Sequence, residues 1–313
     1  MMARRNTTDL CGILPFDKSS GPSSHDIINI VRRISGEGRV GHAGTLDPMA
    51  TGLLVVLLGP ATRLARFLTA ESKTYRAKIT FGSATDTDDA DGEIISTLPV
   101  PSQVSEVGFV EACIEGLIGQ RDQLPPAYSA IKLGGTKAYT VARRGETPEL
   151  QPRTVRIDDA RLITLDGGPP PTWDVELSVS KGTYIRSIAR DLGSALGTAA
   201  HLSELRRSRS GTVDVGQAIT ADIIKGHSGS VSEFFIDPVE TLGFPVIQIG
   251  DDQAAAASNG CRLSIDPLDS EPAIDTPLTV VDRSRIIGIF SSDGARLIPM
   301  LILPGDAPLL RHP

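Results

Sequence analysis

The amino-acid sequence predicts an α+β fold in which long strands are joined to amphipathic helices. Two segments, Tyr75–Phe81 and Trp173–Val179, alternate apolar and polar residues as half-buried strands do. The helical segments around them do not follow the regular βαβ order of a doubly wound parallel sheet. The 313 residues exceed the usual size of one domain, and short apolar runs after residue 235 predict a second, smaller β-rich domain.

Ahead of these strands, the pattern predicts a helix, a loop, a buried strand and a short helix. Apolar residues at helical spacing follow Ser23 and Ser24, either of which could cap the first helix. Residues 36–44 are typical of a glycine-rich loop, Leu53–Leu58 of a fully buried strand, and Pro60 of a helix start.

The remaining elements follow in order along the chain. Helices are predicted within Val107–Ile118 and Ile185–Leu196. Residues 121–152 are rich in Pro, Gly and basic residues, so we expect an exposed insertion rather than core. We place the first domain at residues 1–235 and the second at residues 236–313.

The net charge of −7 does not exclude a nucleic-acid partner, because the acidic excess is confined to one end of the chain. Residues 221–313 carry 6 Lys and Arg against 13 Asp and Glu, which accounts for all of it. Local patches, rather than net charge, govern binding to phosphates. Basic residues recur elsewhere in small clusters, which are Arg32/Arg33/Arg39, Arg143/Arg144 and Arg206/Arg207/Arg209.

The sequence does not fit a membrane or secreted protein. The longest apolar run, Leu53–Leu58, is too short to span a bilayer, and Asp9 interrupts any signal-peptide core. The cysteines are odd in number, far apart and not spaced as metal ligands. They predict a reducing cytoplasm and no zinc site: Cys11, Cys113 and Cys261.

We also expect no metal and no cofactor. The stretch 86-DTDDADGEI-94 resembles a calcium loop, but its fifth position is Ala90, so a solvated loop with Asx turns is the better interpretation. The five histidines are scattered, and the chain has no GxGxxG, Walker or GxSxG motif.

The strongest candidate for chemistry is Asp47, in the stretch 41-GHAGTLDPMATGLLVVLLG-59. Its neighbours are small, so a bulky ligand could approach the carboxylate, and the strand that follows would support it rigidly. Aspartate before proline is also a common way to begin a turn, and the pattern alone leaves both interpretations open. A glycosidase needs a second carboxyl group at a defined distance, and none is evident. A single acid favours a rearrangement completed within one site.

Five further residues are candidates for substrate binding, each with a structural alternative. Tyr75 begins a strand and could belong to the core. Tyr184 and Arg186 lie where a strand turns into a helix, a favoured place for binding groups. Arg186 could hold a buried carboxylate ionised or pair with a surface acid. His42 is a loop residue that could stack on a base, and Leu205 is most simply core.

These residues lie in motifs that resemble the bacterial tRNA pseudouridine-55 synthase family, TruB. The resemblance starts from GHAGTLDPMATGLL and covers most of residues 11–210 in the family's order and spacing. Its other segments are 17-DKSSGPSSHDIINIVRR-33, 73-KTYRAKITFG-82, 85-TDTDDADG-92, 125-PPAYSAIKLGGTKAY-139, 180-SKGTYIRSIARDLG-193 and 201-HLSELRR-207.

The resemblance implies the pseudouridine synthase fold, with a mixed, largely antiparallel sheet, flanking helices and a small β-rich, PUA-like C-terminal domain. It implies that uridine 55 in the T loop of tRNA becomes pseudouridine without metal, nucleotide or cofactor. The N-glycosidic bond is cut, the uracil rotates, and a bond from the sugar to C5 replaces it. The partner would be the T arm of tRNA, clamped by the insertion, and we expect a monomer.

The family's roles are carried over residue by residue. Asp47 matches the essential aspartate, which either attacks the sugar carbon or removes a sugar proton. Tyr75 matches the tyrosine that stacks on the target base, and Arg186 the arginine that pairs with the catalytic acid. The remaining matches are Tyr184 and Leu205 to residues lining the uridine pocket, and His42 to the histidine that enters the T loop as the base is flipped out.

The sequence departs from the family at two places and leaves two alternatives. Ser19 follows Lys18 where many relatives have proline. Residues 236–313 resemble the family's RNA-binding domain weakly and carry the acidic excess, so we expect them to contribute shape and stability. The alternatives are an RNA-binding or tRNA-folding module with secondary catalysis, and a pseudouridine synthase acting on another RNA, as in guide-RNA particles. The intact catalytic set favours the enzyme.

Overall fold

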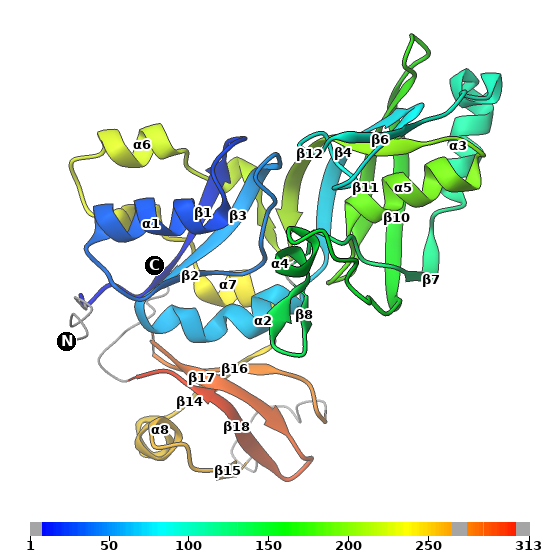
Figure 1. Ribbon diagram of the computed structural model, residues 1–313. Helices are drawn as coiled ribbons and strands as arrows, with labels where there is room; N and C mark the ends of the chain where they lie inside the picture. The colour runs from blue at the N-terminus through cyan, green and yellow to red at the C-terminus, as the bar shows by residue number, and fades with distance from the viewer. Residues whose placement is uncertain (1–7, 130, 265–273, 284, 305–313) are drawn as a thin grey trace. The chain divides into compact units, whose positions relative to one another are not determined.

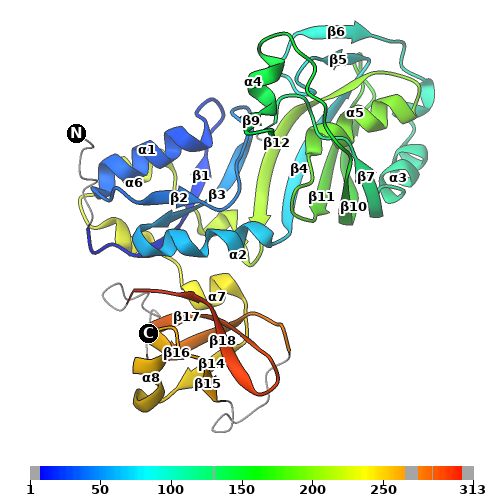
Figure 2. The same cartoon turned by 60° about the horizontal axis from the view of Figure 1, so that its bottom comes forward.

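The chain forms two compact units. The computed structural model describes residues 8–129, 131–264, 274–283 and 285–304 (Figures 1 and 2). The first unit contains the chain up to Pro48, then Gly52–Ala70 and the chain from Arg209 onward, and the second contains Met49–Thr51 and Glu71–Ser208. Within the described residues no helix is both long and apolar enough to cross a membrane.

The N-terminal part of the first unit is built on β3 (Thr51–Leu58), with which β1 (Gly12–Lys18) and β2 (Val40–His42) pair antiparallel. The fully buried strand predicted at Leu53–Leu58 is confirmed. The prediction of a glycine-rich loop at residues 36–44 is wrong for Val40–His42. These residues form a strand because β3 offers them hydrogen-bonding partners.

Helix α1 (Ser24–Ser35) confirms the first helix prediction. Ser23 is the N-cap and forms a capping box with Asp26, which satisfies backbone donors at both positions. Gly36 ends the helix with φ 70°, a left-handed conformation that glycine adopts without steric cost.

The helix predicted from Pro60 begins as the 3₁₀ turn η1 (Gly59–Leu64) and continues as α2 (Ala65–Ala70). After the chain re-enters the first unit at Arg209, short elements complete this part of the unit. They are β13 (Val213–Asp214), η3 (Val215–Gln217), α6 (Ala221–Gly226), η4 (Val231–Phe234) and α7 (Pro238–Leu242).

The C-terminal part of the first unit is a five-stranded sheet, as its short apolar runs predict. The strand order is β14-β16-β17-β18-β15, and only β14 and β16 pair in parallel. Helix α8 (Asp251–Ser258), which the sequence analysis did not predict, packs against β17. The strands are β14 (Val246–Ile249), β15 (Leu263–Ser264), β16 (Leu278–Asp282), β17 (Arg285–Ser292) and β18 (Arg296–Ile302).

This C-terminal sheet shares a hydrophobic core with β3 and α2. Val281 and Ile289 belong to the same buried cluster as Leu57 and Phe67. At its edge, the Arg63 guanidinium donates to the carbonyl of Ile302 over 3.1 Å. Since removing a shared core leaves cavities on both sides, the sheet supports β3, and this agrees with a stabilising role for the C-terminal part. The boundary near residue 235 stays a prediction.

The second unit is an antiparallel sheet with strand order β12-β4-β11-β10-β7. The alternation predicted for Tyr75–Phe81 and Trp173–Val179 is confirmed, because the inward side chains of β4 and β11 are buried. Helix α3 (Val107–Glu115) packs against β10 and α5 (Ile185–Ala195) against β4 (Figure 1). The strands are β4 (Lys73–Phe81), β7 (Gly119–Gln123), β10 (Arg153–Asp166), β11 (Thr172–Val179) and β12 (Ala200–Ser210).

The insertion predicted at residues 121–152 is not exposed throughout. Its first residues complete β7, where Gln123 pairs with Arg153 and is buried. Ala138 is also fully buried. Strand pairing outweighs the local Pro, Gly and basic composition here. The remaining small elements of the unit are β5 (Ser83–Thr85), β6 (Ile94–Thr97), η2 (Ser102–Ser105), β8 (Lys132–Leu133), β9 (Thr136–Lys137) and α4 (Ala138–Ala142).

Lys73, the first residue of β4, gives a test of the second unit's packing. Its side chain is buried and donates to the carbonyl of Glu71. Burial lowers the pKa of Lys73 from 10.5 to about 8, with further lowering from the nearby Arg207 and Lys181. The folded state therefore releases this proton before the unfolded state does as the pH rises.

We expect the unfolding free energy to increase between pH 8 and pH 10.5, because the unfolded chain binds more protons in that window. The gain should be roughly 1–2 kcal/mol after allowance for solvent screening. Urea denaturation across this range measures it, and Lys73→Met should lack the increase. The same increase in Lys73→Met would assign it to another group.

Candidate functional site

The loop that carries Asp47 is fixed on its N-terminal side by helix α1. The buried hydroxyl of Ser24 accepts from the Leu46 N–H over 2.8 Å and donates to the Leu46 carbonyl over 2.9 Å. Ser24 is the first residue of α1, whose capping box sets its orientation. One side chain therefore holds both backbone groups of the residue that precedes Asp47.

The loop is fixed on its C-terminal side by β1 and the turn that follows. The ammonium of Lys18, which is fully buried, donates to the carbonyls of Pro48 and Ser19, each over 2.9 Å. The Gly21 N–H donates to the same Pro48 carbonyl over 2.9 Å. Since Ser19 contributes only its carbonyl, a proline there could make the same contact, and the departure at this position does not disturb the loop.

Asp47 is partly exposed. It lies between Leu46 and Pro48, whose backbone groups are held by hydrogen bonds. A carboxylate on such a support keeps its position when a reacting group approaches, which is the requirement for a catalytic residue. His42, the last residue of β2, is half-buried and pairs with Val56 of β3. Both residues belong to the first unit.

Tyr75 and Leu205 are buried on two neighbouring strands of the second unit, β4 and β12. Ser208 donates to the carbonyl of Thr74, and Lys78 pairs with Glu204. These contacts show that β4 and β12 run antiparallel, with Tyr75 and Leu205 about two positions apart in the register. The two predicted site residues therefore lie on neighbouring strands of the same unit.

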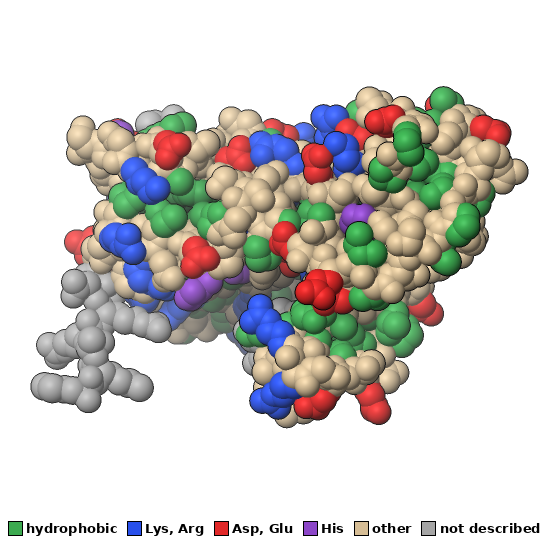
Figure 3. Space-filling model, turned by 45° about the horizontal axis from the view of Figure 1, so that its top comes forward, with side chains coloured by type: hydrophobic (Ala, Val, Ile, Leu, Met, Phe, Trp, Pro, Cys, Tyr) green, Lys and Arg blue, Asp and Glu red, His purple; other side chains and the backbone are tan. Residues whose placement is uncertain are grey.

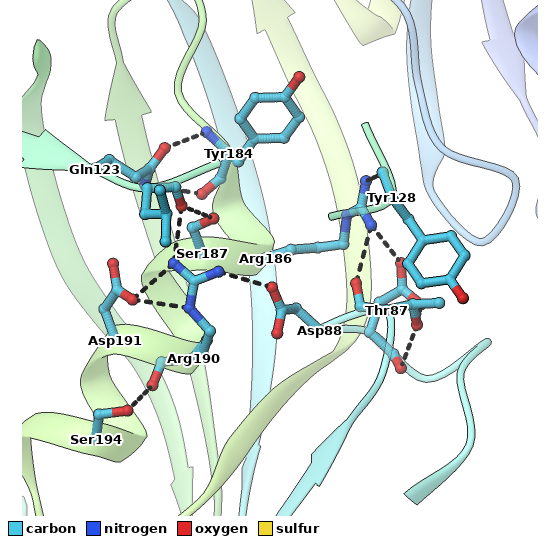
Figure 4. A network of polar contacts seen from close by, with 12 residues as sticks. Thr87, Asp88, Gln123, Tyr128, Tyr184, Arg186, Ser187, Arg190, Asp191 and Ser194 are labelled. Atoms are coloured by element: carbon cyan, nitrogen blue, oxygen red, sulfur yellow. Dashed lines mark hydrogen bonds and ion pairs between the residues drawn. The ribbon is translucent and has the colours of Figure 1, made fainter. Parts of the chain in front are cut away.

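Arg186, the second residue of α5, is buried with 4% of its surface exposed. Its guanidinium donates to the carbonyls of Thr87 and Tyr128, each over 2.9 Å (Figure 4). Its Nη1 atom also lies 3.4 Å from the Asp89 carboxylate, which is itself buried. A buried ion pair of this kind is stabilised by the additional hydrogen bonds around it.

The acidic stretch 86–93 is solvated in part, as expected: Asp86, Asp91 and Glu93 are exposed, and the Asp91 N–H donates to the Asp89 carboxylate in an Asx turn, but Asp89 itself is buried. Asp89 accepts from the Thr87 hydroxyl over 2.6 Å, and its backbone lies against Leu202 of β12. Asp88 pairs with Arg190 of α5 over 3.0 Å. Burial raises the pKa of Asp88, although the two arginines of α5 act in the opposite direction.

Asp89 is the acidic residue of this site that sequence reasoning missed. The available signal was the motif 85-TDTDDADG-92, in which the charge pattern alone does not tell a solvated acid from a buried one. Only the packing of the loop against α5 makes Asp89 the partner of Arg186. The predicted pairing of Arg186 with Asp47 joins residues of different units and stays a prediction.

Tyr184 directly precedes α5 and is half-buried. The amide of Gln123 holds its backbone on both sides, accepting from its N–H over 2.9 Å and donating to its carbonyl over 3.1 Å. The Arg153 guanidinium lies 5.0 Å from the centre of the Tyr184 ring, at cation–π distance. Tyr184 and Arg186 are therefore two positions apart at the start of one helix, and each is held by its own set of neighbours.

The basic clusters predicted from the sequence are partly used within the protein. Arg32 donates to Asn29 and to the carbonyls of Gly38 and Val40. Arg207 is buried, and Arg143 lies 5.5 Å from the Tyr139 ring centre. On the face drawn in Figure 3, basic and acidic side chains are interspersed rather than gathered in one basic patch.

Comparison with protein families matches residues 32–242 of the chain. The model of the TruB family pseudouridylate synthase N-terminal domain matches residues 32–185, and that of the tRNA pseudouridylate synthase B C-terminal domain matches residues 186–242. The sheet formed by β14 to β18 lies beyond both matched ranges.

Several curated proteins named tRNA pseudouridine synthase B are similar to this chain. The one from Mycobacterium tuberculosis (strain H37Rv) is 38% identical over 307 residues, which cover 96% of this chain and 98% of the relative. The one from Mycobacteroides abscessus is 38% identical, with 93% and 96% covered. The one from Syntrophotalea carbinolica is 44% identical over 214 residues, with 68% of each chain covered.

Solved structures with a similar fold include a chain of a Cbf5–Nop10–Gar1 complex, with a TM-score of 0.70 and 23% identity over 96% of this chain and 87% of that one. A chain of an H/ACA RNP bound to a substrate RNA containing 2′-deoxyuridine has a TM-score of 0.68 and 20% identity, with 96% and 88% covered. At these identities the likeness establishes the fold. The predicted α+β pseudouridine synthase fold is confirmed.

Proposed function

Because the chain belongs to the TruB family of tRNA pseudouridine synthases, we propose that it isomerises uridine 55 in the T loop of tRNA. The enzyme is an isomerase that forms pseudouridine in tRNA.

The rigid support of Asp47 is the observation that carries this proposal. Both neighbours of Asp47 have their backbone groups held by buried side chains, Ser24 on one side and Lys18 on the other. A turn aspartate would not require such support, whereas a catalytic carboxylate would. Asp47 acts as the catalyst, either attacking the sugar carbon or removing a sugar proton.

The reaction requires no external redox or group-transfer partner. The N1–C1′ bond of uridine breaks, the uracil rotates while it is retained, and a C5–C1′ bond forms. The hydrogen on C5 then leaves as a proton, and N1, which has lost its bond to the sugar, takes up a proton, so that the product is an isomer of uridine. In this scheme Tyr75 stacks on the uracil and is placed for proton transfer, while Tyr184 and Leu205 line its pocket.

Two further residues have roles in this scheme, one toward the RNA and one toward the catalytic acid. His42 occupies the place of the flipped base, since an enzyme that acts on a stacked base must first extrude it. Arg186 takes the role of the arginine that pairs with the catalytic acid in the family. The T arm of tRNA is the partner, the insertion holds it, and the enzyme works as a monomer in the cytoplasm.

Tritium release tests this function directly. A tRNA transcript labelled with tritium at C5 of uridine should release a stoichiometric amount of tritium when incubated with the enzyme. A matched transcript with cytidine in place of uridine 55 should release none. Equal release from the two transcripts would contradict the assignment of position 55, while leaving the synthase activity in place.

A further inference from the structure

Gln123, at the end of β7, is a buried side chain that the reaction scheme does not use. Only 1% of its surface is exposed. Its amide lies against the backbone of Tyr184, and Figure 4 shows both hydrogen bonds between them. Residues 61 positions apart in sequence are joined here by a paired donor and acceptor.

The N–H of Tyr184 needs such a partner because it lies at a helix terminus, whereas its carbonyl also accepts from the Ile188 N–H over 3.2 Å. The first N–H groups of a helix have no partner within it, and the Tyr184 side chain does not cap α5. Gln123 itself is fixed by the pairing of β7 with β10, in which it lies opposite Arg153. Arg153 covers the Tyr184 ring. Two facing residues of one strand pair thus hold the backbone and the ring of Tyr184.

The same contact extends to Arg186 through the helix. Leu124, the next residue after Gln123, accepts from the Ser187 hydroxyl over 2.9 Å and from Arg190 over 2.8 Å. Tyr128 accepts from Arg186. The chain from Gln123 to Tyr128 therefore runs along the start of α5 and holds it at successive positions (Figure 4).

We propose that Gln123 is a positioning residue for the isomerisation, which acts by holding Tyr184 and the start of α5 in the geometry that the uridine pocket requires. It does not touch the substrate. The inference rests on the proposed roles of Tyr184 and Arg186. The alternative is a purely structural glutamine that satisfies a helix terminus and leaves turnover unchanged when the fold survives its loss.

The chemistry of the contact supplies a sharp test. A neutral amide donates and accepts at once, whereas a carboxylate only accepts. In Gln123→Glu the ionised group can accept from the Tyr184 N–H but repels the Tyr184 carbonyl. A protonated carboxyl group can make both bonds, and burial raises its pKa, so the protonated form is restored as the pH falls.

The experiment measures kcat and KM for tRNA in the whole protein. In Gln123→Leu we expect kcat to fall by about ten- to a hundredfold, because misplaced groups lose the reactive geometry. KM should stay within about twofold, since binding by the rest of the RNA surface is retained. In Gln123→Glu the same deficit should shrink, relative to the native enzyme, as the pH decreases from about 8 to about 5.5.

Two controls separate the possible failures. Thr154→Val removes a side-chain bond to Asp122 in the same pair of strands but at an exposed position, and should leave kcat unchanged. Tyr184→Ala tests the function on which the inference rests. If Tyr184→Ala retains full turnover, the proposed pocket is wrong. If it does not, but Gln123→Leu retains kcat, or Gln123→Glu shows no recovery at low pH, the positioning role is overturned.

Discussion

Replacing Asp47 with asparagine should reduce pseudouridine formation by more than about a thousandfold, as removal of a catalytic nucleophile or base does in other enzymes. The amide has nearly the same size and shape but neither the charge nor the basicity of the carboxylate. Because the loop is held by Ser24 and Lys18 rather than by Asp47 alone, the fold should persist.

Tritium release from labelled tRNA measures this effect, and thermal unfolding checks the fold. Asp91→Asn is the matched control, because Asp91 is an exposed acid of the stretch 86–93 and should tolerate the same change with normal turnover. Full tritium release by Asp47→Asn would remove Asp47 as the catalyst. A low unfolding temperature in that variant would instead assign the loss of activity to the fold.

Replacing Arg186 with methionine should lower the unfolding free energy by about 3–5 kcal/mol, because it removes the arginine that pairs with the buried Asp89 carboxylate. The carbonyls of Thr87 and Tyr128 lose their donors as well. Turnover should fall further than stability explains, since Arg186 also serves the catalytic acid in the proposed scheme. Urea denaturation gives the first quantity and tritium release the second.

A double variant tests the coupling of this pair. Adding Asp89→Asn to Arg186→Met removes the negative charge of Asp89 as well. The combined loss of unfolding free energy should therefore be smaller than the sum of the two single losses. Arg190→Met is the matched control. Its partner Asp88 is also acidic, but the Arg190 side chain is 26% exposed and its loss should cost less. Additive losses in the double variant would show that Arg186 and Asp89 do not act as a pair.

Most secondary structure could be predicted because its signals are local. The alternation in Tyr75–Phe81 and the cap at Ser23 each lie within a few residues, and both elements formed as expected. The short apolar runs were also sufficient to predict the strands of the C-terminal sheet. Val40–His42 was mistaken for loop because its strand depends on pairing with β3. Helix α8 was missed for a related reason, since DDQAAAAS has little amphipathic pattern.

The identity of the candidate site residues could likewise be predicted from local signals, whereas their contacts could not. Asp47, Tyr75, Arg186 and the other candidates could be named from motifs, because each motif is a short stretch of chain with fixed residue types. Their order and spacing indicated the family, which the comparisons confirmed. Residue identity and local order were therefore contained in the sequence.

Burial and pairing were decided by folding. Asp89 had the sequence features of a solvated acid and became the buried partner of Arg186 because the loop packs against α5. Gln123 lay in a segment expected to be exposed and became the residue that holds Tyr184. Such contacts join positions 61 or more residues apart. Local periodicity does not encode these contacts. They form only when the sheet and helix bury these polar groups, because a buried polar group must be hydrogen-bonded.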